Sequence, residues 1–265
     1  MSEQTNLLDL SGRTALVTGA GQGIGATTAH YLAEHGAQVV VNDFDEARAD
    51  AVAGEIREHG GKAVGIQADV TDFESVTSMI AEAKDVLGVV DVLINNAGNA
   101  GANPSRPSRE PFWEKDPAEW EAFLQVNLYG VLNCCRAALP GMIEAGKGGR
   151  LLTVISEAGR QGESGLEAYS AAKAGAAGLM RGLARTVARY DITSNCVAIG
   201  ATRTPAVQGM MENEEFAKRV LKSYLIRRFG EPSDVAAMLT FLSSESASWI
   251  TAQTYPVNGG FSVSQ

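Results

Sequence analysis

Tyr169 and Lys173 are the two residues of this chain whose types and spacing most directly indicate chemistry. Their i, i+4 spacing places the phenol and the ammonium one turn apart on one face of a helix. A free phenol has a pKa of about 10 and is a poor acid or base at neutral pH, whereas a nearby ammonium favours the phenolate. The pair therefore indicates a tyrosine whose pKa is lowered towards the working range for proton transfer. Because such pairs also occur on helix surfaces without any function, other residues must support this interpretation.

Polar residues at the ends of two apolar runs give that support. Ser156 ends the run 151–156 (LLTVIS), 13 residues before Tyr169, and the segment 95–98 (NNAG) follows the run 92–94. Short apolar runs of this kind indicate strands that are covered on both faces, and open parallel sheets bind ligands at the carboxyl ends of their strands. The sequence therefore predicts an active site at that edge of a sheet.

A glycine-rich turn at residues 18–25 (TGAGQGIG) lies between the first predicted strand and the first predicted helix. Glycines allow a tight turn and a close approach of the backbone to a pyrophosphate, which the amides and dipole of the helix N-terminus attract. The spacing is G-x-x-x-G-x-G, so the general G-x-G-x-x-G fingerprint fits only loosely. Its place in the chain nevertheless indicates a dinucleotide site.

Asp43 ends the second predicted strand, 18 residues after Gly25. A carboxylate at this point can accept hydrogen bonds from the adenosine ribose hydroxyls and repels a 2′-phosphate. No Arg or Lys adjoins it, since Phe44 and Asp45 follow. The sequence therefore predicts NAD in preference to NADP. The alternative is that Asp43 only caps the next helix.

Strand-like and helix-like segments alternate along the whole chain. The predicted strands are 14–17, 38–41, 63–67, 92–94, 151–155, 194–198 and 254–257, and the predicted helices are 24–36, 45–60, 72–87, 117–145, 166–190 and 232–243. Asp45 and Asp72 are candidate N-caps, and Gly36 and Gly60 stand where C-terminal glycines belong. This alternation predicts an α/β fold of the Rossmann type, a doubly wound parallel sheet of about seven strands with helices on both faces. Residues 1–265 contain no linker and are predicted to form a single domain.

Charge and cysteine usage exclude several classes of protein. The net charge of −9 argues against nucleic acid or an anionic membrane as the main partner. The three cysteines, Cys134, Cys135 and Cys196, are odd in number and are predicted to be small buried residues without disulfides. His30, His35 and His59 lack ligand spacing, so we expect exposed positions and no metal site. Without a signal peptide or a long apolar run, the protein is predicted to be cytoplasmic.

Two segments are predicted to lie on the substrate side, a long loop at 98–120 and a mobile helical lid at 204–228. Phe112 and Trp113 either face an apolar ligand or seal the loop onto the core. Arg106 and Arg109 either meet a carboxylate or phosphate of the substrate or are solvated surface charges.

Taken together, these motifs resemble the short-chain dehydrogenase/reductase family, in its compact single-domain branch. The resemblance covers essentially the full chain through 18–25, Asp69-Val70, 95–98, Asn127, Ser156, Tyr169 with Lys173, and 257–260 (VNGG). It implies an oxidoreductase that moves a hydride between a nicotinamide cofactor and a secondary alcohol or ketone. Family members are commonly homotetramers that pair through the long helices and the C-terminal strand, so an oligomer is implied as well.

The resemblance also implies a role for each matching residue. Tyr169 would be the acid in ketone reduction or the base in alcohol oxidation, and Ser156 would hold the substrate oxygen. Lys173 would lower the pKa of Tyr169 and bind the nicotinamide ribose, while Asn127 would position a water that relays protons to Lys173. The expected cofactor contacts are Gly19, Gln22, Gly23, Ile24, Gly25, Asp43, Phe44, Asp69 and Val70 (adenine), Asn96 (ribose), Ala97, Gly98, Tyr169, Lys173, Thr202 (carboxamide) and Thr204.

Two departures from the family pattern affect this reading. Ile199 stands where the family usually has proline, which is expected to loosen the backbone near the nicotinamide, and the loop at 98–120 is longer than usual.

The stretch 156–169 is similar to members that act on hydroxyacyl or cyclic hydroxy compounds. A catalytically silent NAD(H)-binding sensor or scaffold is the alternative, against which the full set of four catalytic residues argues. An epimerase or dehydratase of the extended branch would need a larger C-terminal region.

Overall fold

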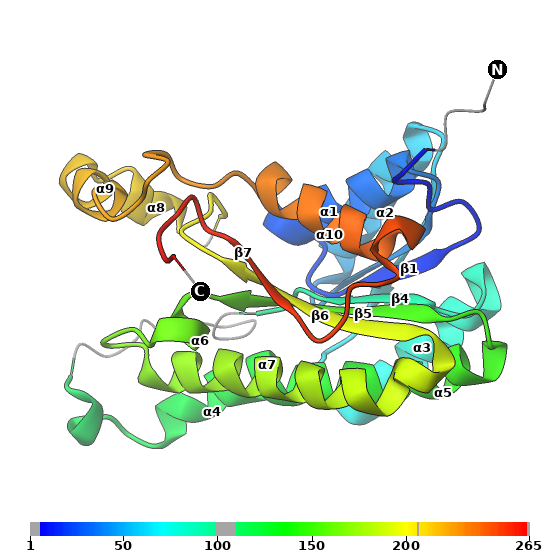
Figure 1. Cartoon of the computed structure of the whole chain (residues 1–265), viewed down its shortest axis with the longest axis horizontal. Coiled ribbons are helices and arrows are strands. Elements are labelled where there is room, and N and C mark those ends of the chain that lie inside the picture. Colours follow the sequence, from blue (N-terminus) through cyan, green and yellow to red (C-terminus); the bar gives the residue numbers. More distant parts are fainter. Residues whose placement is uncertain (1–5, 99–109, 206, 264–265) are drawn as a thin grey trace.

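The computed structural model describes residues 6–98, 110–205 and 207–263. Within these residues, seven parallel strands form one sheet in the order β3-β2-β1-β4-β5-β6-β7 (Figure 1). Their bounds are β1 Thr14–Val17, β2 Gln38–Asp43, β3 Lys62–Gln67, β4 Val92–Asn95, β5 Gly149–Ser156, β6 Ile192–Ile199 and β7 Thr254–Val257. The predicted doubly wound sheet is confirmed. Its strand order reverses between β1 and β4, the point at which sheets of this kind bind ligands.

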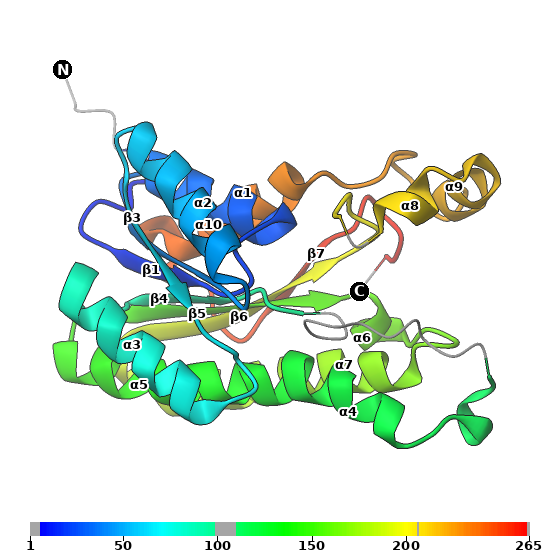
Figure 2. The ribbon, with the colours of Figure 1, turned by 180° about the vertical axis from the view of Figure 1, so that it is seen from behind.

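Helices cover both faces of the sheet, as Figures 1 and 2 show from opposite sides. One face carries α1 (Gly23–Glu34), α2 (Glu46–Glu58) and α10 (Pro232–Ser243). The other carries α3 (Phe73–Leu87), α5 (Gly130–Ala145) and α7 (Glu167–Val187). A sheet buried on both faces requires strands that are apolar throughout, which is why these strands show no alternation of polar residues in the sequence.

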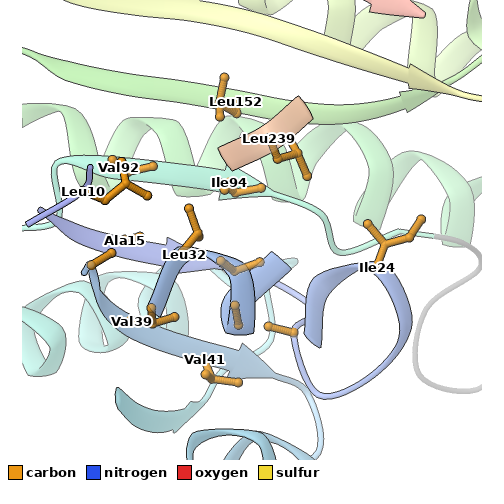
Figure 3. Packing of buried hydrophobic residues seen from close by; sticks show 14 of the residues in the cluster. Leu10, Ala15, Ile24, Leu32, Val39, Val41, Val92, Ile94, Leu152 and Leu239 are labelled. Atoms are coloured by element: carbon orange, nitrogen blue, oxygen red, sulfur yellow. The ribbon is translucent and has the colours of Figure 1, made fainter. Parts of the chain in front are cut away.

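Successive residues of the central strands enter two separate cores. Ala15 and Val17 of β1 pack with α1 and α10, whereas Leu16 packs with the helices of the opposite face. Leu152 of β5 joins the first core, and its side chain faces Leu239 of α10 in Figure 3. Side chains along these strands thus alternate between the two cores, so the central strands are packed from both sides. This packing holds the residues at their carboxyl ends in place.

The predicted helix ends are confirmed in detail. The Asp45 carboxylate accepts a hydrogen bond from the Arg48 amide, and that of Asp72 accepts one from the Glu74 amide. Gly36 and Gly60 have φ of 97° and 85°, the left-handed region that favours glycine after a helix. Five of the seven strands are one to three residues longer than predicted, mainly because polar residues at their ends do not extend the apolar pattern.

The segment 117–145 is not one continuous α-helix as predicted. It consists of α4 (Ala118–Leu124), a π-helical turn (Gln125–Tyr129) and α5. A π turn widens the backbone by i→i+5 bonding and is often found at functional sites. Hydrophobic periodicity does not report this change, and here the turn contains Asn127.

The two segments that are predicted to lie on the substrate side contain short helices. Phe112–Glu114 is a 3-10 turn, and the 204–228 segment contains α8 (Gln208–Met211) and α9 (Glu214–Leu221), which confirms its helical character. The Phe112 ring stacks on Trp120 with centroids 5.2 Å apart, so Phe112 packs against another residue of the loop. Trp113 is 81% exposed and does not seal the loop onto the core. Arg106 and Arg109 lie outside the described residues.

The cysteines are free and buried, as predicted. Burial raises the pKa of Cys135 and of Cys196 to about 12. Of the histidines only His59 is exposed. His30 and His35 are half-buried, because each pairs with a neighbouring turn or helix. No helix among the described residues is long and apolar enough to cross a bilayer.

Candidate active site

The glycine turn after β1 is built from residues that tolerate no side chain. Gly19 and Gly23 have φ of 61° and 57°, and a Cβ on Gly25 would lie 2.3 Å from the Gly19 carbonyl oxygen. α1 begins at Gly23 with no side-chain cap from Gln22 and no acidic residue in its first turn. The first backbone amides of α1 thus have no side-chain cap and no acidic residue within the first turn of the helix, which fits a pyrophosphate.

Thr18 and Asn96 hold this turn against the end of β4. The Thr18 hydroxyl accepts the amide N–H groups of Asn96 and Ala97, each at 3.1 Å. The Asn96 side-chain nitrogen donates to the carbonyls of Thr18 (2.9 Å) and Gly19 (3.0 Å). That nitrogen is therefore engaged within the turn, and the predicted ribose contact of Asn96 stays a prediction.

Asp43 is 5% exposed and joins the end of β2 to the glycine turn. Its Oδ2 accepts the Gly21 N–H at 3.0 Å, and its Oδ1 accepts the Asp45 N–H at 3.0 Å. The helix cap is Asp45, so the alternative that Asp43 only caps α2 is wrong. The carboxylate instead lies beside the glycine turn, where an adenosine ribose would bind in a fold of this type.

The prediction that no cation stands beside Asp43 is wrong. Nη2 of Arg48 donates to Oδ1 of Asp43 at 2.7 Å. Arg48 is five positions along the chain, but the capping turn at Asp45 brings the third residue of α2 back over the end of β2. The sequence does contain a signal for this contact, namely an N-cap aspartate with an arginine as the third residue of the helix that follows.

Three elements bring the four predicted catalytic residues together. Ser156 is the last residue of β5, Tyr169 and Lys173 occupy the first two turns of α7, and Asn127 lies in the π turn. Gly159 allows α7 to pack closely against the segment after Ser156, because a Cβ there would lie 2.6 Å from Cβ of Lys173. The arrangement joins a hydroxyl, a phenol, an ammonium and an amide at one edge of the sheet.

Phe123 packs edge-on against the Tyr169 ring, with centroids 5.9 Å apart. Burial raises the pKa of Tyr169, and the nearby Ser156 hydroxyl opposes this rise in part. The expected lowering of this pKa is therefore not found, because desolvation of the phenolate outweighs the favourable contacts. A phenol with a raised pKa keeps its proton at neutral pH.

Lys173 is 4% exposed, and its Nζ lies 5.8 Å from the centroid of the Tyr169 ring. Nζ donates to the Val154 carbonyl of β5 at 2.9 Å. Burial lowers the pKa of Lys173 to about 8, since the charged form loses its hydration. The ammonium is thus present at neutral pH but close to its own titration.

Asn127 is fully buried, and its side-chain nitrogen donates to the Phe123 carbonyl at 2.8 Å. Its Oδ1 and the Lys173 Nζ face the same side of Gly98, because a Cβ built on that glycine would lie 3.2 Å and 3.3 Å from them. The absence of a side chain at Gly98 therefore lets an amide oxygen and an ammonium lie close to its backbone.

The other predicted cofactor residues lie around the same edge. Asp69 accepts the Thr71 amide and hydroxyl, Val70 is buried, and Phe44 is 49% exposed. Thr202 is buried and donates to the Gly200 carbonyl at 3.1 Å. Thr204 lies opposite the glycine turn, with Cγ2 3.6 Å from a Cβ built on Gly23. Gln22 and Ile24 belong to that turn.

Ile199 does not loosen the end of β6. It pairs in register with Ser156 on one side and Val257 on the other, and its carbonyl accepts the Glu157 N–H at 3.0 Å. The departure from proline therefore leaves the sheet intact beside Ser156.

A clasp of residues that the sequence did not indicate holds the C-terminal segment against the segment after Ser156. Glu157 is 3% exposed, and its carboxylate accepts from the Ser262 hydroxyl at 2.5 Å and from Arg160 at 2.8 Å. Asn258 donates to the Ser262 hydroxyl at 3.0 Å. Since Glu157 directly follows Ser156, the clasp fixes the backbone that carries the predicted substrate-binding hydroxyl.

The sequence from residue 19 to residue 262 matches the family described as Enoyl-(Acyl carrier protein) reductase. A cis-4-hydroxycyclohexanecarboxylate dehydrogenase from Sinomonas cyclohexanicum is 39% identical over 249 residues, covering 94% of this chain and 96% of that protein. The 3-oxoacyl-[acyl-carrier-protein] reductase FabG from Staphylococcus aureus is 37% identical, with coverage of 94% and 97%. A 7α-hydroxysteroid dehydrogenase in complex with NADH and 7-oxo glycochenodeoxycholic acid has the same fold, with a TM-score of 0.88, 34% identity, and coverage of 96% and 95%.

The chain belongs to the short-chain dehydrogenase/reductase family, as its motifs predicted. It is an oxidoreductase that transfers a hydride between a nicotinamide cofactor and an alcohol or ketone. The comparisons give no support to a catalytically silent sensor or scaffold.

Proposed function

We propose that this protein is an NAD-dependent dehydrogenase or reductase of cyclic secondary alcohols and ketones that carry an acidic group. The proposed preference for NAD rests on the buried carboxylate of Asp43, which accepts a hydrogen bond from Gly21 of the glycine turn. In that position it accepts the ribose hydroxyls of NAD and disfavours the additional phosphate of NADP.

In ketone reduction a bound nicotinamide would supply the hydride for the carbonyl carbon of the substrate. Tyr169 and Ser156 donate hydrogen bonds to the substrate oxygen, and Tyr169 transfers its proton there as negative charge develops. The raised pKa of Tyr169 suits this direction, because the phenol is protonated and available at neutral pH. In alcohol oxidation the same group takes the proton back.

Lys173 and Asn127 support this proton transfer. The Lys173 ammonium stabilises the phenolate that remains after Tyr169 has lost its proton. Lys173 Nζ and Asn127 Oδ1 both lie beside Gly98, which supports the proposed relay of a proton from solvent towards Lys173. Both side chains are buried, so their orientations are maintained throughout the reaction.

The proposed substrate class rests on the relatives and on the wall beside Tyr169. One relative is named for a hydroxycyclohexanecarboxylate, and one structure contains an oxo bile acid conjugate. A shallow hollow is lined in part by Phe112, Trp120 and Phe123, and Phe123 contacts the Tyr169 ring. The buried Trp120 Nε1 at this hollow has no hydrogen-bond partner. Aromatic walls of this kind fit an alicyclic ring. Lys115 at the same hollow is paired with Glu167, so the acidic group is proposed from the relatives alone.

The remaining predictions belong to this proposal. Residues 1–265 form one dinucleotide-binding and catalytic domain, with 98–120 and 204–228 on the substrate side. A homotetramer is supported by exposed apolar residues on two neighbouring helices of one face, Phe73 on α3 and Leu132 on α5, each 37% exposed. A cytoplasmic location stays a prediction from the sequence.

The test combines cofactor binding with turnover. NADH fluorescence should reveal binding at least tenfold tighter than that of NADPH, a difference of about 1.4 kcal/mol, and equal binding would contradict the role of Asp43. Cyclic hydroxy acids, secondary alcohols and hydroxyacyl thioesters should then be compared at the NADH absorbance. Tyr169→Phe should lower kcat by about 10²- to 10⁴-fold with NADH binding retained. Tyr190→Phe, beyond the far end of α7, is the matched control, and normal turnover by Tyr169→Phe would remove the proposed acid.

A further inference from the structure

The ion pair between Arg48 and Asp43 places a cation beside the carboxylate that is proposed to select the cofactor. Its distance of 2.7 Å is that of a charge-assisted hydrogen bond. Arg48 also packs against the glycine turn, since a Cβ on Gly21 would lie 2.6 Å from Cβ of Arg48. The same Cβ would lie 2.7 Å from Oδ2 of Asp43. Glycine at position 21 therefore brings the turn, the carboxylate and the guanidinium into contact.

The hydrogen-bonding capacity of Arg48 is only partly used. Nε is buried and has no hydrogen-bond partner, and the Asp45 carboxylate lies 3.8 Å from it, beyond hydrogen-bond reach. The side chain is 41% exposed, whereas that of Asp43 is 6% exposed, so the guanidinium reaches from the buried carboxylate to the surface. A buried N–H without a partner indicates that a further acceptor belongs near it.

We propose that Arg48 is a second specificity-determining residue, which reduces the discrimination between NAD and NADP that Asp43 creates. The proposal rests on the proposed function, in which Asp43 faces the adenosine ribose. Two effects act in the same direction. The guanidinium offsets part of the negative charge of Asp43, and it offers donors to a 2′-phosphate, which arginine binds well.

Asp43 is not freed completely when it binds a ribose. A carboxylate has about four lone-pair sites, and three are already occupied by Gly21, Asp45 and Arg48. A ribose hydroxyl can use the remaining site, or it can replace Arg48, whose donors then turn towards solvent or a phosphate. The wild-type protein should therefore bind NADPH measurably, although more weakly than NADH.

The test is a double-mutant cycle on dissociation constants for NADH and NADPH, measured by fluorescence with the full-length protein. Arg48→Gln should weaken NADPH binding about tenfold, the size of one charge-assisted hydrogen bond on a half-exposed arginine, and NADH binding less than about threefold. Asp43→Asn should tighten NADPH binding, because the repulsion disappears and Arg48 is released. In the double variant that gain should be lost.

Arg57→Gln is the matched control, since Arg57 lies on the same helix and donates to the Ala63 carbonyl at 2.9 Å. It should leave the ratio of the two constants unchanged. Equal weakening of NADH and NADPH by Arg48→Gln would overturn the proposal and show that the ion pair only supports the turn. A gain of Asp43→Asn that persists without Arg48 would overturn it as well. If the wild type instead prefers NADPH, the role of Asp43 fails, while the coupling to Arg48 is still measured by the cycle.

Discussion

Replacing Lys173 by Met removes an ammonium that is enclosed between β5 and α7. The folded protein keeps this group at a pKa of about 8, against 10.5 for a free lysine, because burial disfavours its charge. That difference corresponds to about 3 kcal/mol of unfavourable free energy at neutral pH. The variant loses the hydrogen bond to the Val154 carbonyl, which offsets about 1 kcal/mol. We therefore expect Lys173→Met to raise the free energy of unfolding by about 2 kcal/mol while activity is lost.

The pH dependence of this gain has a definite sign. Below pH 8 the lysine is protonated in both the folded and the unfolded protein, so the full cost of burial is present. Between pH 8 and about 10.5 the unfolded chain binds the proton and the folded protein does not, so the stability of the wild type rises with pH. The advantage of the variant should therefore be largest at neutral pH and disappear towards pH 10.

Urea unfolding at pH 7 and pH 9.5, at one fixed protein concentration, measures this difference. Lys218→Met is the matched control, because that side chain is 74% exposed on α9 and should show no pH-dependent gain. If Lys173→Met is no more stable than the wild type at pH 7, or if its advantage grows with pH, the argument that burial lowers the pKa of Lys173 is refuted.

Two further predictions concern other parts of the chain. Ser262→Ala should lower the free energy of unfolding by about 1–2 kcal/mol and reduce kcat, because the buried carboxylate of Glu157 loses a hydrogen-bond donor. Urea unfolding and turnover assays measure the two effects. Ser246→Ala is the control, because the Ser246 hydroxyl lies at the surface. An unchanged stability would show that the clasp is not a structural contact in solution. The three buried thiols should not react with a thiol reagent at pH 8 until the protein unfolds, because burial raises their pKa values far above that pH, and rapid labelling of the native protein would contradict their burial.

The sequence predicted the fold well because most strands are short, largely apolar and covered on both faces. The Tyr169–Lys173 pair was equally predictable, since the helix period alone places both side chains on one face. The same local reasoning predicted several strands too short. Lys62, Asn95 and Arg150 are polar residues that pair within the sheet although they lie outside the predicted strand bounds.

Contacts that depend on tertiary structure were missed. The approach of Arg48 to Asp43 requires the capping turn at Asp45, and the clasp joins Glu157 to Ser262 across 105 positions of the chain. The cap pattern at Asp45 and Arg48 is a local signal for the first contact, whereas no local pattern indicates the second. The pKa of Tyr169 was assigned the wrong direction for a related reason. The charge of a sequence neighbour is visible in the chain, whereas the burial that outweighs it is known only after folding.

Three unfavourable features converge on the carboxyl edge of the sheet. Lys173 is a buried cation, Asp43 is a buried anion, and Asn127 lies in a π turn that interrupts the helix from α4 to α5. Each of them costs stability by itself, and each is held by the two anchored cores on either side of the sheet. Such a combination is expected where side chains must keep fixed positions for charge to move between them. The stability gain expected for Lys173→Met follows from the same reasoning, because removing a group that is held for catalysis relieves the cost of holding it.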